Sequence, residues 1–420
     1  MKRVFLIAML LPMLAQAQTL EECSQAAERN YPLIKQYGLI EKTTQLTMDN
    51  IQRGWLPKVS VSAQATYQSD VPAWPDNMQT LLQQMNVDAK GLRKDQYRVG
   101  VDVSQTVFDG GAISSQKELT LRQGMVQEAE NEVNLYAVRK RVNELYFSLL
   151  LLDAQITLKQ DLRELLASNE RKLASMLKKG TAAESDYNSV CAERLSVDQQ
   201  LISLQSQRRT LQSVISAFCG MEVTQVSKPV PVEMKEGNRR PELRLADAQL
   251  RLADAQEKWL KTRLLPQLSV FASGYYGYPG YNMFEDMMRH RWSLNGMVGA
   301  RLTWNIGAFY THGNDRAKVK LQREMAENGR EVFLFNSRME QMQQQESIDR
   351  YRKLMADDEE IILLRQKVRK AAESRLAHGI IDVNDLVREI NNENAAKVQQ
   401  SIHEIEMLKE QYDLKFTTNF

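Results

Sequence analysis

The sequence predicts a mainly α-helical chain that also carries four β-strands and is built as an internal duplication. Two long stretches, about 112–220 and 308–420, contain no proline and are rich in residues that favour helix, such as Leu, Gln, Glu and Lys. Four segments alternate apolar and polar residues with a period of two, as β-strands do. Residues of the first half also recur in the second half at a nearly constant spacing.

The recurrence has two spacings. At a shift of 209 residues, the first set is Pro32, Pro57 and Tyr67, which return as Pro241, Pro266 and Tyr276. At a shift of 199 residues, the second set is Gly100, Val103, Gly180 and Asp186, which return as Gly299, Leu302, Gly379 and Asp385. The length changes between two predicted strands, so we expect a surface hairpin loop there in both copies. The period is too long for a solenoid and indicates a duplicated half-molecule.

The expected organisation has four parts. Residues 1–17 resemble a signal peptide, since two basic residues and a short apolar run precede Ala15-Gln16-Ala17. The remaining parts are a first repeat at 18–220, an equatorial linker at 221–238 and a second repeat at 239–420. Strands are expected at about 57–68, 97–108, 266–277 and 293–306, and turns between long helices at about 180–186 and 379–385.

The chain has three cysteines, Cys23, Cys191 and Cys219. Two carboxylates, Glu21 and Glu22, directly precede Cys23, so no lipid anchor is expected. An odd number of cysteines cannot all pair, and Cys191 and Cys219 lie in one helical stretch. We therefore expect no structural disulfide.

The proline-free stretches predict very long helices. If Gly124 is tolerated, one helix runs from about Ala112 to Lys178 and is ~100 Å long at 1.5 Å per residue. Apolar residues recur at spacings of three and four, which favours antiparallel helices packed as coiled coils. A compact bundle of shorter helices is the alternative.

The strands are two-faced. From Val59 to Tyr67 the odd positions are apolar or aromatic and the even positions are polar. Each strand has about ten residues, which is the length that a tilted strand needs to cross a bilayer. The aromatic residues expected at the membrane interface are Trp55, Trp74, Tyr275, Tyr276, Trp292 and Trp304. A soluble, half-buried sheet is the alternative, because it uses the same alternation.

Four strands cannot close a membrane barrel, since ~8 is the usual minimum and open edges cannot face lipid. The barrel would have to be shared between chains. Three copies with four strands each would give a closed barrel of ~12 strands whose polar face lines a lumen.

Several motifs match one known family. They are the segment from Thr19 to Pro32, the helix-to-strand corners that end at Pro57 and Pro266, and the return corner Phe108-Asp109-Gly110-Gly111. On these motifs the chain resembles the TolC-like outer-membrane efflux proteins over nearly its whole mature length. The second return corner has Ala308-Phe309-Tyr310 in place of the aspartate and glycines, which indicates a corner of different construction.

The resemblance implies a homotrimer in the outer membrane of a Gram-negative bacterium. Its shared twelve-stranded barrel would contact outer-membrane lipid, and a long helical barrel would extend into the periplasm. A small equatorial region would hold Glu222–Gly237. The implied partners are a periplasmic adaptor (membrane fusion) protein and an inner-membrane pump.

Two helical turns match the family's periplasmic tip, where the adaptor docks and the channel narrows. Their residues are Gly180, Thr181 and Asp186 in the first turn, and Gly379, Asp382, Asp385 and Arg388 in the second. Glycine suits a left-handed helix C-cap, an acid suits the first turn of the next helix, and Thr181 and Glu184 have the spacing of a capping box. Helix capping and a gate of symmetry-related carboxylates both remain open for Asp186 and Asp385. Arg388 stands where family members can carry a second acid, so an ion pair with Asp385 is expected.

No enzyme, cofactor or metal motif is present. His403-Glu404 begins like a zinc protease motif, but Met407 stands where the second histidine is needed. The 55 basic and 53 acidic residues nearly cancel, so charge predicts no binding to nucleic acid. The predicted function is a passive outer-membrane exit duct of a tripartite efflux or export system, with drug efflux and type I protein secretion both open as its use. The alternative of a different class is a secreted coiled-coil scaffold or adhesin.

Overall fold

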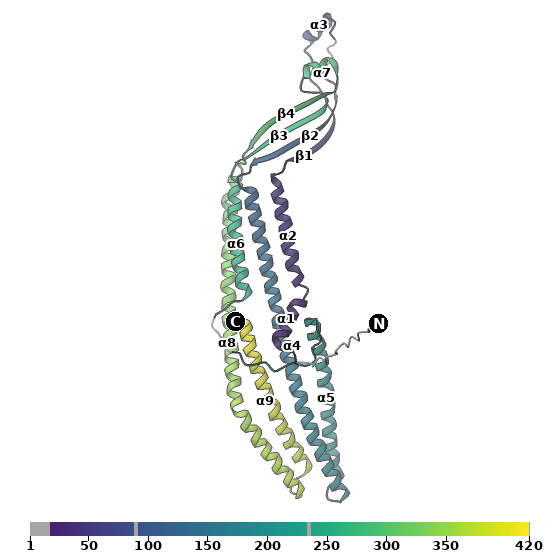
Figure 1. Cartoon of the computed structure of the whole chain (residues 1–420), viewed down its shortest axis with the longest axis vertical. Helices are drawn as coiled ribbons and strands as arrows, with labels where there is room; N and C mark the ends of the chain where they lie inside the picture. Colours follow the sequence, from purple (N-terminus) through teal and green to yellow (C-terminus); the bar gives the residue numbers. More distant parts are fainter. Residues whose placement is uncertain (1–16, 88–90, 233–236, 420) are drawn as a thin grey trace, which may run out of the picture. The chain divides into compact units, whose positions relative to one another are not determined.

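The computed structural model describes residues 17–87, 91–232 and 237–419. The predicted signal peptide, apart from Ala17, lies outside the described residues. The helices are α1 (Leu20–Asn30), α2 (Ile34–Gln52), α3 (Asp76–Gln84), α4 (Ala112–Lys178), α5 (Glu184–Cys219), α6 (Pro241–Thr262), α7 (Met283–Arg289), α8 (Ala308–Ala377) and α9 (Val383–Thr418). The strands are β1 (Lys58–Tyr67), β2 (Asp95–Phe108), β3 (Gln267–Tyr278) and β4 (Ser293–Thr303), and a 3-10 turn, η1, covers Arg53–Trp55. The predicted class, mainly helix with four strands, is confirmed (Figure 1).

The order of elements repeats along the chain. A helix, a strand, a short helix, a strand and two long helices occur once from α2 to α5 and again from α6 to α9. The loops between strands are more ordered than expected, because each contains a short helix, α3 or α7. Tyr278 and Met287 pack with Leu92 from the other loop, and this small core folds the two loops together.

The long helices have the predicted extent. Helix α4 begins at Ala112 and ends at Lys178 without interruption. Gly124 lies against Thr44 of α2, since a Cβ built on it would meet the Thr44 hydroxyl oxygen at 2.5 Å. The glycine that weakens helix propensity here therefore allows α2 and α4 to approach closely.

The chain forms two compact units, and each unit takes residues from both repeats. One contains residues up to 38, 128–246 and 328 onward, and the other contains 39–127 and 247–327. In the first unit, α5 runs alongside the later part of α4, and α9 runs alongside α8 (Figure 1). All four helices contribute to one apolar core that includes Leu166, Val190, Ala372 and Leu386.

The second unit contains the sheet. Its strands are antiparallel and lie in the order β1-β2-β3-β4. Val59 pairs with Val103, Val101 pairs with Gly274, and Gly274 pairs with Gly296, so the odd positions of β1 and β2 share a face with the even positions of β3 and β4. β1 and β4 are the edge strands.

The end of β4 differs from the prediction. The strand ends at Thr303, so Trp304 and Ile306 lie beyond it. The Trp304 indole nitrogen donates to the Leu264 carbonyl at 2.9 Å, and the chain turns at Gly307 into α8. Hydrogen bonding in this turn replaces the strand ladder that the alternating pattern suggested.

Candidate functional site

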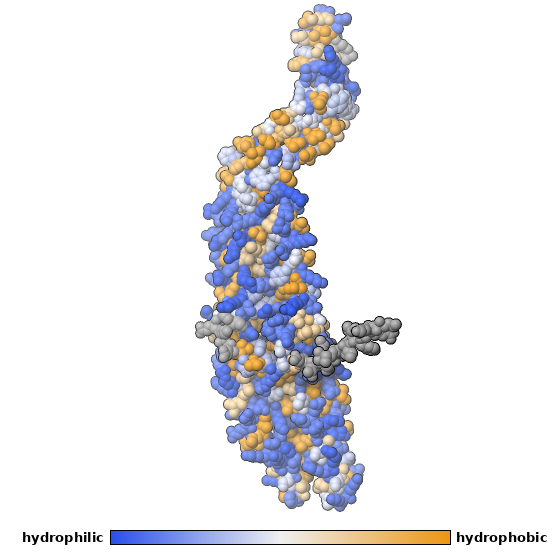
Figure 2. Space-filling model, in the orientation of Figure 1, coloured by the Kyte–Doolittle hydropathy of each residue, from blue (hydrophilic) through white to orange (hydrophobic). Residues whose placement is uncertain are grey.

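One face of the sheet is apolar and uncovered. Val61, Leu294 and Val298 are 73%, 82% and 82% exposed, although such side chains normally lie in a core. Figure 2 shows apolar residues gathered over the strands. The patch is continuous across β1 to β4 because the register places these residues on one face. Exposed apolar patches of this kind mark contact with a membrane or another protein.

The opposite face is polar. It carries Ser60, Ser62 and Gln64 of β1, and Asp102 of β2, which accepts a hydrogen bond from the Ser273 hydroxyl at 2.6 Å. The Arg301 guanidinium lies 5.1 Å from the centre of the Phe271 ring. This face can be hydrated without leaving polar groups unpaired.

Aromatic rings lie at both ends of the apolar face. At one end Trp292 stacks with Tyr97 at 6.2 Å and packs on Tyr276 at 5.5 Å, measured between ring centres. At the other end, Trp55 and Trp304 lie at the two edge strands and are 39% and 53% exposed. Rings with a polar atom favour the boundary between hydrocarbon and water.

Two further residues are expected at this interface. Tyr275 lies next to Tyr276 in β3 and so projects from the polar face, where its hydroxyl donates to the Pro279 carbonyl at 3.1 Å. Trp74 packs against Phe284 and the small loop core, and its ring is only partly exposed. Strand alternation places Tyr275 on the polar face and loop packing places Trp74 against the small core, and their position at a membrane interface stays a prediction.

The first return corner is built around Asp109. Its buried carboxylate accepts hydrogen bonds from the main-chain nitrogens of Gly111 at 2.8 Å and Ile113 at 2.6 Å. Gly110 has a φ of +66° and lies against Leu265, which directly precedes Pro266. The corner thus joins the end of β2 to α4 beside the start of β3. In the second copy, Asn305 and Gly307 form the turn with main-chain hydrogen bonds to Ala308 and Tyr310 instead.

The first helical turn links α4 to α5. Gly180 has a φ of +75°, and the Thr181 nitrogen and hydroxyl both donate to the Met176 carbonyl, at 2.9 and 3.1 Å. Thr181 therefore caps the end of α4, and the predicted capping box with Glu184 is wrong. Helix α5 begins at Glu184, one residue after its N-cap, and the Asp186 carboxylate accepts from the Ala183 nitrogen at 3.3 Å.

The second turn links α8 to α9 and uses its acids differently. Gly379 has a φ of +68°, and Asp382 is the N-cap whose carboxylate accepts from the Asp385 nitrogen at 2.9 Å. The Asp385 side chain is left to pair with Arg388 at 2.8 Å. The capping and charged roles, combined in Asp186, are thus divided here between Asp382 and Asp385.

Replacing Asp382 with alanine should lower the free energy of unfolding by about 1 kcal/mol, because α9 loses its N-cap. Replacing the neighbouring exposed Asn384 with alanine should change it by less than about 0.5 kcal/mol, since Asn384 is within the helix and not its cap. Chemical unfolding of the purified variants, followed by circular dichroism, measures both values. Equal losses would contradict the assigned cap.

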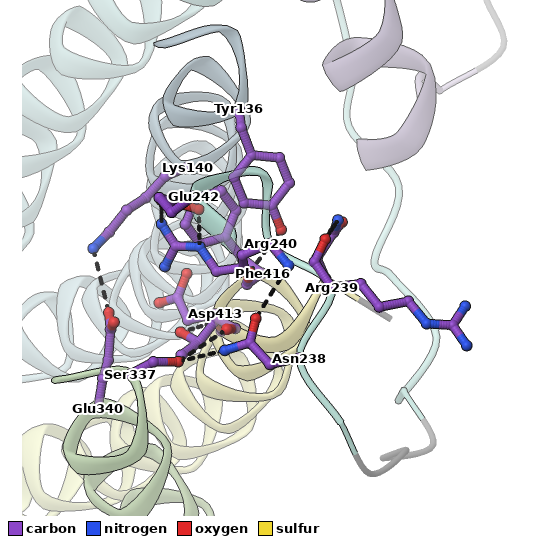
Figure 3. A network of polar contacts seen from close by, with 12 residues as sticks. Tyr136, Lys140, Asn238, Arg239, Arg240, Glu242, Ser337, Glu340, Asp413 and Phe416 are labelled. Atoms are coloured by element: carbon purple, nitrogen blue, oxygen red, sulfur yellow. Dashed lines mark hydrogen bonds and ion pairs between the residues drawn. The ribbon is translucent and has the colours of Figure 1, made fainter. Parts of the chain in front are cut away.

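A polar network that sequence reasoning missed joins the linker to α4 and α9 (Figure 3). Arg240 forms an ion pair with Glu242 and lies over the rings of Tyr136 and Phe416, at 5.5 and 5.0 Å. The Tyr136 hydroxyl donates to the Phe416 carbonyl at 2.6 Å. Burial raises the pKa of Tyr136 to about 12, so this donor keeps its proton. The cue in the sequence was only Arg240-Pro241-Glu242 at a helix start.

Asp413 lies beside this network. Burial raises its pKa to about 6, with Lys409 and Lys140 opposing the shift and Glu410 and Glu144 adding to it. The Oδ1 atom is buried and has no hydrogen-bond partner among the described residues. Folding therefore shifts this carboxyl towards its neutral form relative to the unfolded chain.

Replacing Asp413 with asparagine should raise the free energy of unfolding by about 1 to 3 kcal/mol at pH 8. The folded pKa of about 6 exceeds the unfolded value of 3.8, so the native state binds more protons and loses stability as pH rises between these values. At pH 3.5 the carboxyl is protonated in the folded state and mostly protonated in the unfolded state, so the variant and wild type should be nearly equally stable. Unfolding midpoints across this range test the prediction, and a gain that persists at pH 3.5 would contradict it.

The histidines have partners other than a metal. His290 donates from Nε2 to the Gly91 carbonyl oxygen, 2.6 Å away, and His403 pairs with Asp358 at 2.8 Å. Within the described ranges, no cluster of three or more His, Cys, Asp or Glu residues could hold a metal ion. Among the described helices, none combines the length and apolarity that crossing a membrane requires.

Comparison with solved structures identifies the fold. The VceC outer-membrane protein of Vibrio cholerae is 12% identical, has a TM-score of 0.67, and the match covers 95% of this chain and 94% of that one. This chain has the TolC-like channel fold. The CmeC outer-membrane channel of Campylobacter jejuni, at 13% identity and a TM-score of 0.67, matches over 95% of this chain and 85% of that one. The open state of the MtrE outer-membrane channel of Neisseria gonorrhoeae has the same identity and TM-score, covering 95% and 88%.

The TolC-like fold of this chain is identified by comparison of structures and not by comparison of sequences. No family model matches the chain, and no curated protein matches it. The expected resemblance is confirmed at the level of fold. Within the TolC-like fold, the sheet, the corners and the two turns described above are the surfaces on which a function can be based.

Proposed function

We propose that this protein is an outer-membrane exit duct that passively conducts substrates out of a Gram-negative cell. Three copies would form one channel, in which the four strands of each chain contribute to a barrel of ~12 strands. A periplasmic adaptor and an inner-membrane pump would supply cargo and energy. No residue is assigned a catalytic role.

The uncovered apolar face of the sheet carries this proposal. Val61, Leu294 and Val298 would each be left in water if the protein worked as a soluble scaffold. Lipid covers such a face without further protein contacts, while the polar face lines a water-filled lumen. The ring of Trp292 at one end, and the rings of Trp55 and Trp304 at the other, would then lie at the two lipid boundaries.

The unpaired edges of β1 and β4 support the sharing of the barrel. Main-chain groups at an open edge cannot be hydrogen-bonded by lipid, and each costs several kcal/mol when unpaired there. Pairing β4 of one copy with β1 of the next satisfies both edges. Three identical contacts of this kind close the ring.

The two helical turns are proposed as the adaptor-docking tip. Their glycines, Gly180 and Gly379, are exposed, and the core beneath them anchors both turns through Val190 and Val383. Asp186 would contribute negative charge near the axis, whereas the charge of Asp385 is offset by Arg388. The net charge at the narrowest point would then be set by the balance of these three side chains.

Single-channel conductance of the detergent-purified protein in a planar bilayer tests the duct. We expect discrete steps of one size, with lower cation preference in Asp385→Ala and higher cation preference in Arg388→Ala. Asn384→Ala changes an exposed, uncharged side chain in the same turn, and should leave selectivity unchanged. If cation preference changes equally in all three variants, the assignment of the charged tip is contradicted, whereas the duct is not.

A matched pair in β4 tests the lipid face. Val298→Arg should cost about 2 to 4 kcal/mol per chain if Val298 lies near the bilayer midplane, and the trimer should be lost from membranes. Met297→Arg places the same charge one residue earlier, on the polar face, and should still assemble. Membrane fractionation and native electrophoresis provide the comparison. A wild-type protein that is soluble without detergent and silent in the bilayer would overturn the duct and leave a secreted scaffold.

A further inference from the structure

Two cysteines that are far apart in sequence meet in the first unit. Cys23 of α1 is fully buried, and Cys219, the last residue of α5, is 4% exposed. The Cys219 thiol donates to the Cys23 carbonyl oxygen, with 3.4 Å between sulfur and oxygen and 196 positions between the residues. Cys191 and Cys219 cannot pair, because both lie in α5. The sequence alone does not indicate that Cys23 lies beside Cys219.

Several contacts join the end of α1 to the end of α5 beside the two cysteines. The Asn30 side-chain nitrogen donates to the carbonyls of Ala217 at 3.1 Å and Phe218 at 3.2 Å. The rings of Tyr31 and Phe218 stack with centres 6.2 Å apart and planes 2° apart. These contacts hold the C-terminal end of α1 on the end of α5, so the two thiols meet at a fixed place in the fold.

The two thiols also interact with each other. The interaction with Cys219, together with burial, raises the pKa of Cys23. The hydrogen bond with Cys23 lowers the pKa of Cys219. Within the docked pair, Cys219 is therefore the more acidic thiol.

We propose that Cys23 and Cys219 are a redox pair that forms a disulfide when the protein meets a small-molecule or protein disulfide donor. The thiolate of one of the two cysteines attacks one sulfur of the donor, forms a mixed disulfide and releases the first donor thiolate. The thiol of the other cysteine then loses its proton and attacks the cysteine sulfur of the mixed disulfide, which closes the intramolecular disulfide and releases the second donor thiolate. Two cysteine thiols are oxidised, and one donor disulfide is reduced to two thiols.

The disulfide would fasten the N-terminal helix to the end of the first helical hairpin. A cross-link over so long a loop removes much of the conformational freedom of the unfolded chain. Because both thiols are buried, exchange requires α1 to be undocked, as it is during folding or local opening. Oxidation in the cell rests on the proposed export to a compartment with disulfide donors, whereas the reactivity of the pair does not.

The full-length protein, purified in detergent, would be equilibrated with oxidised and reduced glutathione at graded ratios. Samples would be acid-quenched, unfolded and alkylated, and the free thiols counted by intact mass. At the oxidised limit we expect one free thiol of three, and a tryptic peptide that joins Cys23 to Cys219. Cys191→Ala should keep the cross-link, whereas Cys23→Ala and Cys219→Ala should each abolish it.

A second measurement does not depend on the variants folding equally well. The oxidised wild type should have a higher denaturant midpoint than the reduced wild type, and the same comparison in Cys219→Ala should show no shift. Three alkylated thiols at the oxidised limit, or glutathione adducts without the joined peptide, would overturn the proposal. Neither result would bear on conductance in the bilayer.

Discussion

Replacing Gly110 with alanine is expected to lower the free energy of unfolding by about 2 to 5 kcal/mol. The residue has a φ of +66°, which costs an L-residue about 1 to 2 kcal/mol. An added Cβ would also meet the Leu265 Cβ at 2.6 Å, and relieving such overlap costs about 1 to 3 kcal/mol more. The strain would fall on the corner that places β2, β3 and α4 together.

Chemical unfolding of the purified variant measures this loss. Gly307→Ala in the second corner is the matched control, because its nearest non-neighbouring atom lies 3.3 Å from the added Cβ and its φ is not left-handed. We expect the control to lose less than about 1 kcal/mol. If both variants lose a similar free energy of unfolding, the left-handed backbone and the close packing at Gly110 do not explain the loss.

Replacing Arg369 with methionine is expected to cost about 3 to 5 kcal/mol. Arg369 of α8 pairs with Glu393 of α9 and with Glu373 at 2.6 Å, and the side chains of Arg369 and Glu393 are 10% and 4% exposed. Removing the arginine leaves a buried carboxylate with only Lys397 to offset it, at 2.7 Å. Arg388→Met removes a comparable pair at the surface and should cost less than about 1 kcal/mol.

The pH dependence gives this prediction a second readout. Burial alone would raise the pKa of Glu393, but hydrogen bonds from Lys397 and Arg369 outweigh it and hold the pKa below 4.5. The stabilisation is therefore complete above pH 4.5 and is lost as pH falls through the folded value. The deficit of Arg369→Met should shrink at acidic pH, and the double variant with Glu393→Met should be more stable than the single variant at pH 7. A deficit independent of pH would indicate lost packing instead.

The fold could be predicted from the sequence where a pattern extends over many residues. The absence of proline and the periodicity between Ala112 and Lys178 defined α4, and the period of two from Val59 defined the faces of β1. Both patterns reflect backbone geometry that tertiary contacts do not change. The candidate site could be predicted only in part, because the role of each of its residues depends on a single position and not on a repeated pattern.

Individual residues show why. Thr181 caps α4 and not α5, because a cap depends on the residue at which α5 begins, and helix ends are weakly defined by pattern. Trp74 packs on Phe284 of another loop, which no local pattern indicates. The pairs Arg369–Glu393 and Cys23–Cys219 join different helices, and no local pattern connects residues that only tertiary packing brings together.

Gly274 and Gly296 face each other at the centre of the sheet, next to Val101. Crowding does not account for either glycine, since an added Cβ would meet its nearest atom at 3.7 or 3.9 Å. Without side chains the two strands have more backbone freedom and no packing to resist bending. The sheet is therefore thinnest and least stiff at this pair, and the proposed barrel would curve there at the lowest elastic cost.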